Sequence, residues 1–184
     1  MIKIPKTPRT AFPPGDLTLS IWFYLRNTSD QVIVVSGGAT TGDIAVYHYN
    51  GGLYFLVSSY ISYATGGAGN KWWHLVGTFN GGVNRLYVNG ILRATSTPGW
   101  APATNLNPLF VGCFNNAAND AYINQPVNGL VDHLAIWNYA MTAQQIFWLY
   151  NDPFAMINYP ALLLYGPAGG TPVSNPASSM LVFQ

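Results

Sequence analysis

The sequence contains few charged residues and no glutamate. Its 184 residues include seven lysines and arginines and six acids, all aspartates, so charged residues make up 7% of the chain. An average soluble protein has about 25%. A formal net charge of +1 creates no long-range field that would attract nucleic acid or an anionic membrane surface. Every catalytic mechanism that requires a glutamate is excluded.

Cysteine and long apolar runs are also scarce. Cys113 is the single cysteine, which excludes an intrachain disulfide. The sequence has no run of about 18 apolar residues, the length that a membrane-spanning helix needs. Residues 1–16 carry three basic side chains but are interrupted by prolines and contain no apolar run, unlike a secretory signal. We therefore expect the chain to be made and folded in a cytoplasm.

Apolar residues make up 49% of the chain and aromatic residues 15%, enough for one domain with a full-sized core. Polar and apolar residues alternate over short runs, as in 17–25, and these runs are separated by Gly and Asn. Asn50-Gly51-Gly52 and Asn89-Gly90 are typical of hairpin turns because these residues accept positive φ. The pattern predicts an all-β sandwich or jelly roll. We expect strands at residues 17–25, 32–36, 43–49, 53–59, 71–79, 84–88, 91–95, 109–114 and 129–139.

One helix is expected after these strands. Thr142-Ala143-Gln144-Gln145 has the pattern of a capping box, in which the first and last side chains satisfy each other's backbone N–H groups. Ile146, Leu149 and Tyr150 then form an apolar stripe. Asn151-Asp152-Pro153 ends the helix because the residue before a proline avoids the helical conformation.

The two ends of the chain differ from its middle. We expect an N-terminal proline-rich arm at 1–16, one domain at 17–158 and a C-terminal extension at 159–184. Met180–Phe183, near the end, is apolar. This segment is interpreted either as a frayed terminus or as an arm that docks on a neighbouring subunit.

Four motifs follow one another along the middle of the chain. LSIW stands at 19–22, WWHLVGTFNGG at 72–82 with RLYVNG at 85–90, and NGLVDHLAIW at 128–137, and YAMT at 139–142 leads into the helix. In this order they resemble the laminin G-like, concanavalin A-like jelly-roll superfamily. The resemblance covers about residues 17–152. It implies a β-sandwich of two antiparallel sheets, each of about six or seven strands, with one short C-terminal helix.

The same resemblance assigns structural roles. Asp132 is expected to hydrogen-bond neighbouring backbone, and His74 to bridge strands. The expected structural core signature consists of Trp22, Trp73, His74, Tyr87, Asp132 and Trp137.

The segment that closes the domain, LYNDPFAM at 149–156, resembles the ending of such domains in bacteriophage virion proteins. This resemblance implies a non-enzymatic virion structural protein, either a capsid decoration (cement) protein or a fibre-associated one. We expect a homo-oligomer that contacts other capsid proteins and reaches the virion by assembly in the host cytoplasm.

Catalysis is not expected. Glycosidases need two carboxylates about 5–10 Å apart, and glycosidases of this wider fold place glutamates in an E-x-D-x-E pattern. This chain has no glutamate and no two aspartates at i, i+2 or i, i+4. His48, His74 and His133 lie in expected strands, without the G-x-S-x-G elbow that presents a nucleophilic serine.

A calcium site is a weaker hypothesis, since many relatives hold Ca²⁺ in loops at the rim of the sandwich. Ca²⁺ takes six to eight oxygen ligands, usually including several carboxylates. The richest local cluster here offers one carboxylate, and a plain polar loop is the alternative. Its members are Asn115, Asn116, Asn119 and Asp120. Asp43 is a further lone candidate, and no other cofactor is expected.

Glycan binding is the alternative function, that of a lectin or adhesin module. Sugar rings stack on exposed aromatic side chains, and the sequence offers Tyr47, Tyr49 and Tyr54 around one hairpin. Tyr60 and Tyr63 are expected in a Gly/Ser loop, and Trp100 lies in a Pro-rich loop. The same residues are compatible with cross-strand pairs in the sandwich or with subunit contacts.

Overall fold

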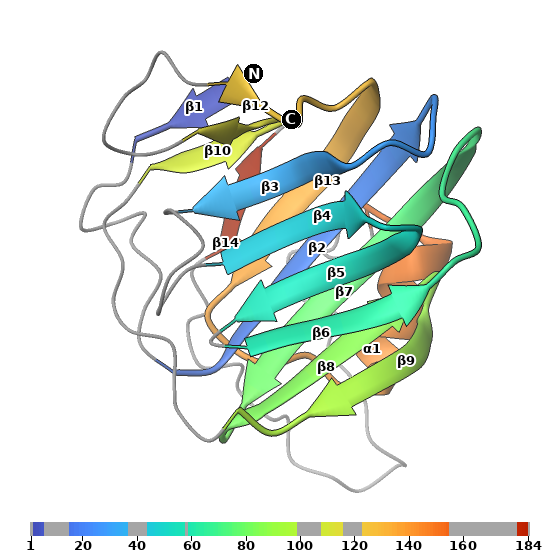
Figure 1. The fold of residues 1–184 in the computed structure, drawn as a ribbon. Coiled ribbons are helices and arrows are strands. Elements are labelled where there is room, and N and C mark those ends of the chain that lie inside the picture. Colours follow the sequence, from blue (N-terminus) through green and yellow to red (C-terminus); the bar gives the residue numbers. More distant parts are fainter. Residues whose placement is uncertain are drawn as a thin grey trace, which may run out of the picture.

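The computed structural model describes residues 2–5, 15–36, 44–57, 59–98, 108–115, 123–154 and 180–183. They form two six-stranded antiparallel sheets packed face to face (Figure 1). The expected all-β sandwich with six or seven strands in each sheet is confirmed. In order across the front sheet, the strands are β1 (Ile2–Ile4), β10 (Leu109–Val111), β3 (Gln31–Ser36), β4 (Ile44–Tyr49), β5 (Gly52–Val57) and β6 (Ser59–Ala64).

The back sheet contains the longest strands and carries the helix α1 behind it (Figure 1). Its strands are, in order, β14 (Met180–Phe183), β13 (Gly129–Trp137), β2 (Leu17–Leu25), β7 (Lys71–Asn80), β8 (Val83–Val88) and β9 (Ile91–Ser96). A small separate ladder joins β11 (Phe114–Asn115) to β12 (Ile123–Asn124). Among the described residues, no helix is long and apolar enough to cross a membrane.

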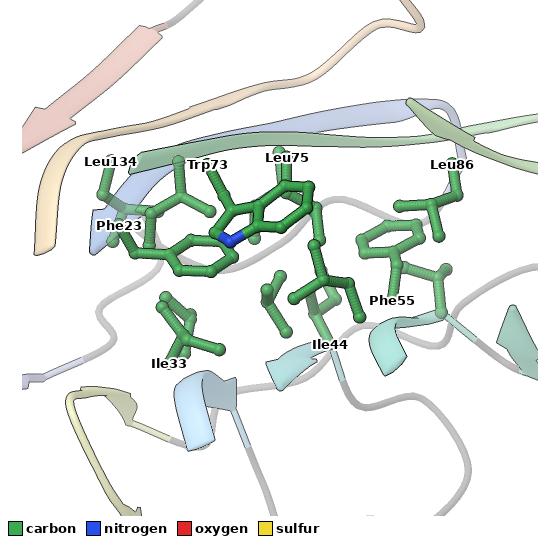
Figure 2. Packing of buried hydrophobic residues seen from close by; sticks show 14 of the residues in the cluster. Phe23, Ile33, Ile44, Phe55, Trp73, Leu75, Leu86 and Leu134 are labelled. Carbon is green, nitrogen blue, oxygen red and sulfur yellow. The ribbon is translucent and has the colours of Figure 1, made fainter. Parts of the chain in front are cut away.

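The core lies between the two sheets and follows directly from the alternation in the sequence. In β2, the residues from Leu17 to Leu25 with odd numbers are at most 1% exposed and point inward. Figure 2 shows Phe23, Trp73 and Leu75 of the back sheet meeting Ile44 and Phe55 of the front sheet. This interface removes a large cluster of apolar side chains from water, which is the main favourable contribution to folding.

The two expected hairpin turns are present. Asn50 and Gly51 join β4 to β5 with φ of 45° and 75°. Asn89 and Gly90 join β8 to β9 with φ of 52° and 76°. In both turns the backbone is left-handed, which explains the choice of Asn and Gly.

Helix α1 (Ala143–Asn151) begins at the expected capping box. The Gln145 N–H donates to Thr142 Oγ1 at 3.3 Å, and the Thr142 N–H donates to Gln145 Oε1 at 2.8 Å. Ile146 and Leu149 are buried against the outer face of the back sheet, where they meet Trp137. The predicted helix is confirmed, and α1 covers part of this outer face.

Removal of the capping hydroxyl tests this helix start. We expect Thr142→Ala to lower the free energy of unfolding by about 1 kcal/mol, because one N-terminal N–H then loses its acceptor. Thr142→Ser keeps the hydroxyl and serves as the matched control, with near-normal stability. Urea unfolding, monitored by tryptophan fluorescence, measures the stability of both variants. Equal losses of unfolding free energy in the two variants would contradict a role for the hydroxyl.

The structure differs from the sequence prediction at β6 and at the two ends. Residues 59–64 form a strand, so the prediction of a loop around Tyr60 and Tyr63 was wrong. β1 pairs with β10, and β14 pairs with β13, so both terminal segments add edge strands to their own sandwich. The boundary expected between 158 and 159 lies outside the described residues.

Candidate functional site

Four tyrosines, Tyr47, Tyr49, Tyr54 and Tyr60, form a row of contacting rings on the outer face of the front sheet, here called the tyrosine row. Tyr47 of β4 lies directly opposite Tyr54 of β5, and their rings stack with centroids 5.2 Å apart and an interplanar angle of 7°. Aligned side chains on neighbouring strands are close enough for such stacking. The row is therefore set by the register of the β4–β5 hairpin.

The other two rings extend this stacked pair at both ends. Tyr60 of β6 contacts Tyr47 edge-on at 6.0 Å and 76°, and Tyr49 contacts Tyr54 at 6.1 Å and 77°. Tyr49 is 48% exposed and Tyr60 is 54% exposed, whereas the central pair is half-buried. The row thus presents one accessible aromatic ring at each end.

The phenol of Tyr47, at the centre of the row, is a neutral hydrogen-bonding group. Partial burial raises the pKa of Tyr47 above its ordinary value, and a side-chain hydrogen bond with Tyr60 raises it further. The Tyr47 hydroxyl therefore stays protonated at neutral pH. A protonated phenol both donates and accepts a hydrogen bond, which suits it to a ligand rich in hydroxyl groups.

The structure brings together only some of the aromatic candidates. Tyr63 lies on the opposite face of β6, packs against the core and holds the Arg93 guanidinium 4.9 Å from its ring centroid. Trp100 lies outside the described residues. Tyr60 and Tyr63 are three residues apart in a strand, and residues at odd spacing point to opposite faces of a sheet.

The expected calcium cluster remains a prediction. Asn115 lies in β11, and its neighbours in the cluster, Asn116, Asn119 and Asp120, lie outside the described residues, as does Asp43. In the part of the chain that is described, no three His, Cys, Asp or Glu side chains are close enough to hold a metal ion.

The four described aspartates, Asp16, Asp30, Asp132 and Asp152, all fix local backbone. Each accepts a hydrogen bond from a backbone N–H at between 2.8 and 3.2 Å. The donors are Gly81, Asn50, His133 and Phe154, respectively. These carboxylates thus hold turns and a bulge in place, a structural role.

The signature residues divide into core and surface. Trp73, His74, Tyr87 and Trp137 are buried, and the Trp73 indole N–H donates to the Ala68 carbonyl at 2.8 Å. Trp22 is half-buried on the outer face of the back sheet, so the prediction that it belongs to the core was wrong. The Asp132 side chain is 56% exposed, at a β-bulge in β13. The prediction that Asp132 belongs to the core was therefore wrong, although its bond to neighbouring backbone is present.

His74 links two strands of the back sheet. Its Nε2 shares a hydrogen bond of 2.9 Å with the Ser20 hydroxyl of β2. Its ring stacks with those of Trp22 and Tyr150 at centroid distances of 4.8 and 5.8 Å, and these two rings also stack with each other at 5.6 Å. Burial, with a smaller contribution from His133, lowers the pKa of His74 to about 3. The imidazole is therefore neutral and enclosed, as a structural bridge requires.

Comparisons with known proteins identify the family of this domain and structures of similar fold. The family model described as "Concanavalin A-like lectin/glucanases superfamily" matches residues 3–147, and no curated protein matches. The native heptameric SAP-like pentraxin from Limulus polyphemus is 17% identical, with TM-score 0.58, over 80% of this chain and 81% of the pentraxin. Identity this low establishes a shared fold only.

Two further structures of similar fold come from bacterial proteins. Domain 4 of an extracellular arabinanase from Geobacillus stearothermophilus, in complex with arabinotriose, is 18% identical, with TM-score 0.60, over 80% of this chain and 71% of that domain. A protein from Bacteroides ovatus, whose name assigns carbohydrate binding only provisionally, is 16% identical, with TM-score 0.60, over 79% of this chain and 43% of that protein. From the family match over most of its length, this chain belongs to the concanavalin A-like lectin/glucanase superfamily, as a laminin G-type domain.

Proposed function

We propose that this chain is a non-catalytic carbohydrate-binding module whose ligand lies on the tyrosine row. The observation that carries the proposal is the pair of exposed rings, Tyr49 and Tyr60, joined through the stacked pair between them. The C–H groups of a sugar stack on an aromatic ring, and its hydroxyls bond to phenol O–H groups. The arabinotriose complex of a fold neighbour supports this reading.

We propose a non-catalytic module because of what its carboxylates do. The four described aspartates hold backbone N–H groups in separate turns and a bulge, and the sequence has no glutamate. Glycoside hydrolysis by a carboxylate pair needs one member with a raised pKa and a free position beside the substrate. A reducing-sugar assay on polysaccharides is therefore expected to show no turnover.

A glycan array tests the binding proposal. We expect the wild-type protein to bind glycans and Tyr60→Ala to lose at least tenfold in affinity, about 1.4 kcal/mol, because one of the two exposed rings is removed. Trp72→Ala removes a ring of comparable exposure, 42%, from the opposite face of the sandwich and is expected to bind normally. Wild-type binding that survives both substitutions would move the site away from the tyrosine row.

The second candidate is the virion structural role, in which copies of the chain decorate a capsid or a fibre in the virion and contact capsid proteins. The LYNDPFAM motif and the low charge favour it. The pairing of β1 and β14 with their own sandwich weakens one argument for it, because both terminal strands fold back on the chain that carries them. Light scattering, together with co-sedimentation with capsids, tests this candidate; a monomer without affinity for capsids would contradict it.

A further inference from the structure

The two exposed rings of the tyrosine row are far apart on the sheet. The register places Tyr49 opposite Gly52, and Gly52 opposite Ala64 of β6. Tyr60 precedes Ala64 by four residues and lies two strands away from Tyr49. With about 4.8 Å between strands and about 3.3 Å per residue, the two Cα atoms are on the order of 16 Å apart. One sugar ring is comparable in size with one tyrosine ring and cannot contact both.

The centre of the row offers less contact surface than its ends. Tyr47 and Tyr54 are half-buried and stack on one another. Each covers one face of the other's ring, and both are less exposed than Tyr49 and Tyr60, so stacking with a ligand concentrates at the two ends. A ligand that gains from both accessible rings must extend from one end of the row to the other.

On the described outer face of β4, β5 and β6, the row has no charged side chain around it. The side chains that share this face of β4, β5 and β6 are Ala45, Leu56, Ser62 and Ala64, together with the tyrosines. The carboxylate of Asp30 lies beside the Tyr49 end, where it accepts from the Asn50 N–H at 2.9 Å. The Asp30 carboxylate would repel an acidic sugar, and the described outer face of these three strands has no basic side chain to offset that repulsion.

From this geometry, and resting on the proposed function, we propose that the ligand is an extended, neutral polysaccharide segment whose sugar units contact Tyr49 and Tyr60 at the same time. The two contacts then act as linked weak sites, whose combined affinity exceeds that of either alone. Binding is expected to depend on chain length and to be insensitive to salt, because no ion pair forms.

Calorimetry with size series of neutral oligosaccharides tests the proposal. The probes are the monomer, trimer and hexamer of arabinose, xylose and glucose, each at 50 and 500 mM NaCl, with hexagalacturonate as the acidic probe. We expect at least one neutral hexamer to bind tenfold or more tightly than its monomer, equally at both salt concentrations. Tyr49→Ala and Tyr60→Ala should each reduce hexamer affinity to near that of the short sugars, and Trp72→Ala should not.

The possible outcomes distinguish a failure of the extended-ligand proposal from a failure of the proposed function. Binding that requires Tyr60 but is equally strong for a monomer and a hexamer, or that favours hexagalacturonate at low salt, would overturn the extended neutral ligand and leave the binding face in place. Binding of no glycan, or binding indifferent to both tyrosines, would overturn the proposed function itself. Unfolding curves of each variant show that lost affinity is not lost structure.

Discussion

Gly77→Ala will lower the free energy of unfolding by about 3 kcal/mol or more, at the upper end of overpacking substitutions. Gly77 lies in β7 with its missing side chain directed inward. A Cβ at this position would lie 2.3 Å from the ring of Phe55, which is 0% exposed and is shown in Figure 2 within the packed core. The ring has no free space to enter, so the methyl group must displace a strand or the ring.

A double-mutant cycle shows whether Phe55 is the cause. Phe55→Leu alone removes ring volume and leaves a small cavity, which is itself destabilising. In the double variant, the alanine methyl enters space that the ring has left, so the combined loss should be smaller than the two single losses together. Urea unfolding of the four proteins measures this coupling. Additive losses would assign the effect of Gly77→Ala to something other than the clash.

The second large effect is a loss of stability in acid that comes from His74. Its pKa in the folded protein is lowered to about 3, against an ordinary value of 6.5. Between these values the unfolded chain binds a proton at this position and the folded chain does not. Stability therefore falls as the pH falls from 6.5 towards 3, by up to about 1.4 kcal/mol per pH unit, and this contribution is constant above 6.5.

The surroundings of the imidazole explain why its charged form is disfavoured. His74 is 1% exposed, its Nδ1 is buried without a hydrogen-bond partner among the described residues, and His133 adds a further unfavourable contribution. Protonation would place a second N–H donor at a position that offers no acceptor. The rings of Trp22 and Tyr150 both stack with the imidazole and help to keep it from water.

His74→Gln isolates this contribution from that of the aspartates. The amide keeps a polar contact with Ser20 but does not titrate, so the variant should be less stable at pH 7 and lose less further stability between pH 6.5 and 4 than the wild type. Unfolding in urea at half-unit steps of pH measures both proteins. Parallel curves would contradict the assignment of the acid sensitivity to His74.

The sequence was sufficient to predict most of the sandwich because its central strands are long and strictly alternating. Leu17–Leu25 and 71–79 each present one apolar face, and Asn-Gly turns join the hairpins. The helix was predictable because the capping box is a local signal. β1 and β14 were not, since each is a short edge strand that pairs with a strand far away in the sequence.

The tyrosine row was predictable in part for the same physical reason. Tyr47, Tyr49 and Tyr54 belong to one hairpin, so their proximity follows from a local turn. Tyr60 joins them only through β6, whose sequence Ser-Tyr-Ile-Ser-Tyr-Ala lacks the alternation of polar and apolar residues that marks a strand. The exposed position of Asp132 was not predictable either, because it depends on a bulge where His133 adopts a φ of 48°. No residue type in this segment indicates such a conformation.

Mapping the bound ligand on the sandwich is the sharpest test of binding at the tyrosine row. We would titrate the isotope-labelled protein with the tightest-binding neutral hexamer and follow amide chemical shifts by NMR. We predict that the largest chemical-shift changes cluster on β4, β5 and β6, around Tyr49, Tyr54 and Tyr60. The amides of the back sheet should show almost no change. Changes centred instead on β2 and β7 around Trp72, or no changes at any concentration, would contradict it.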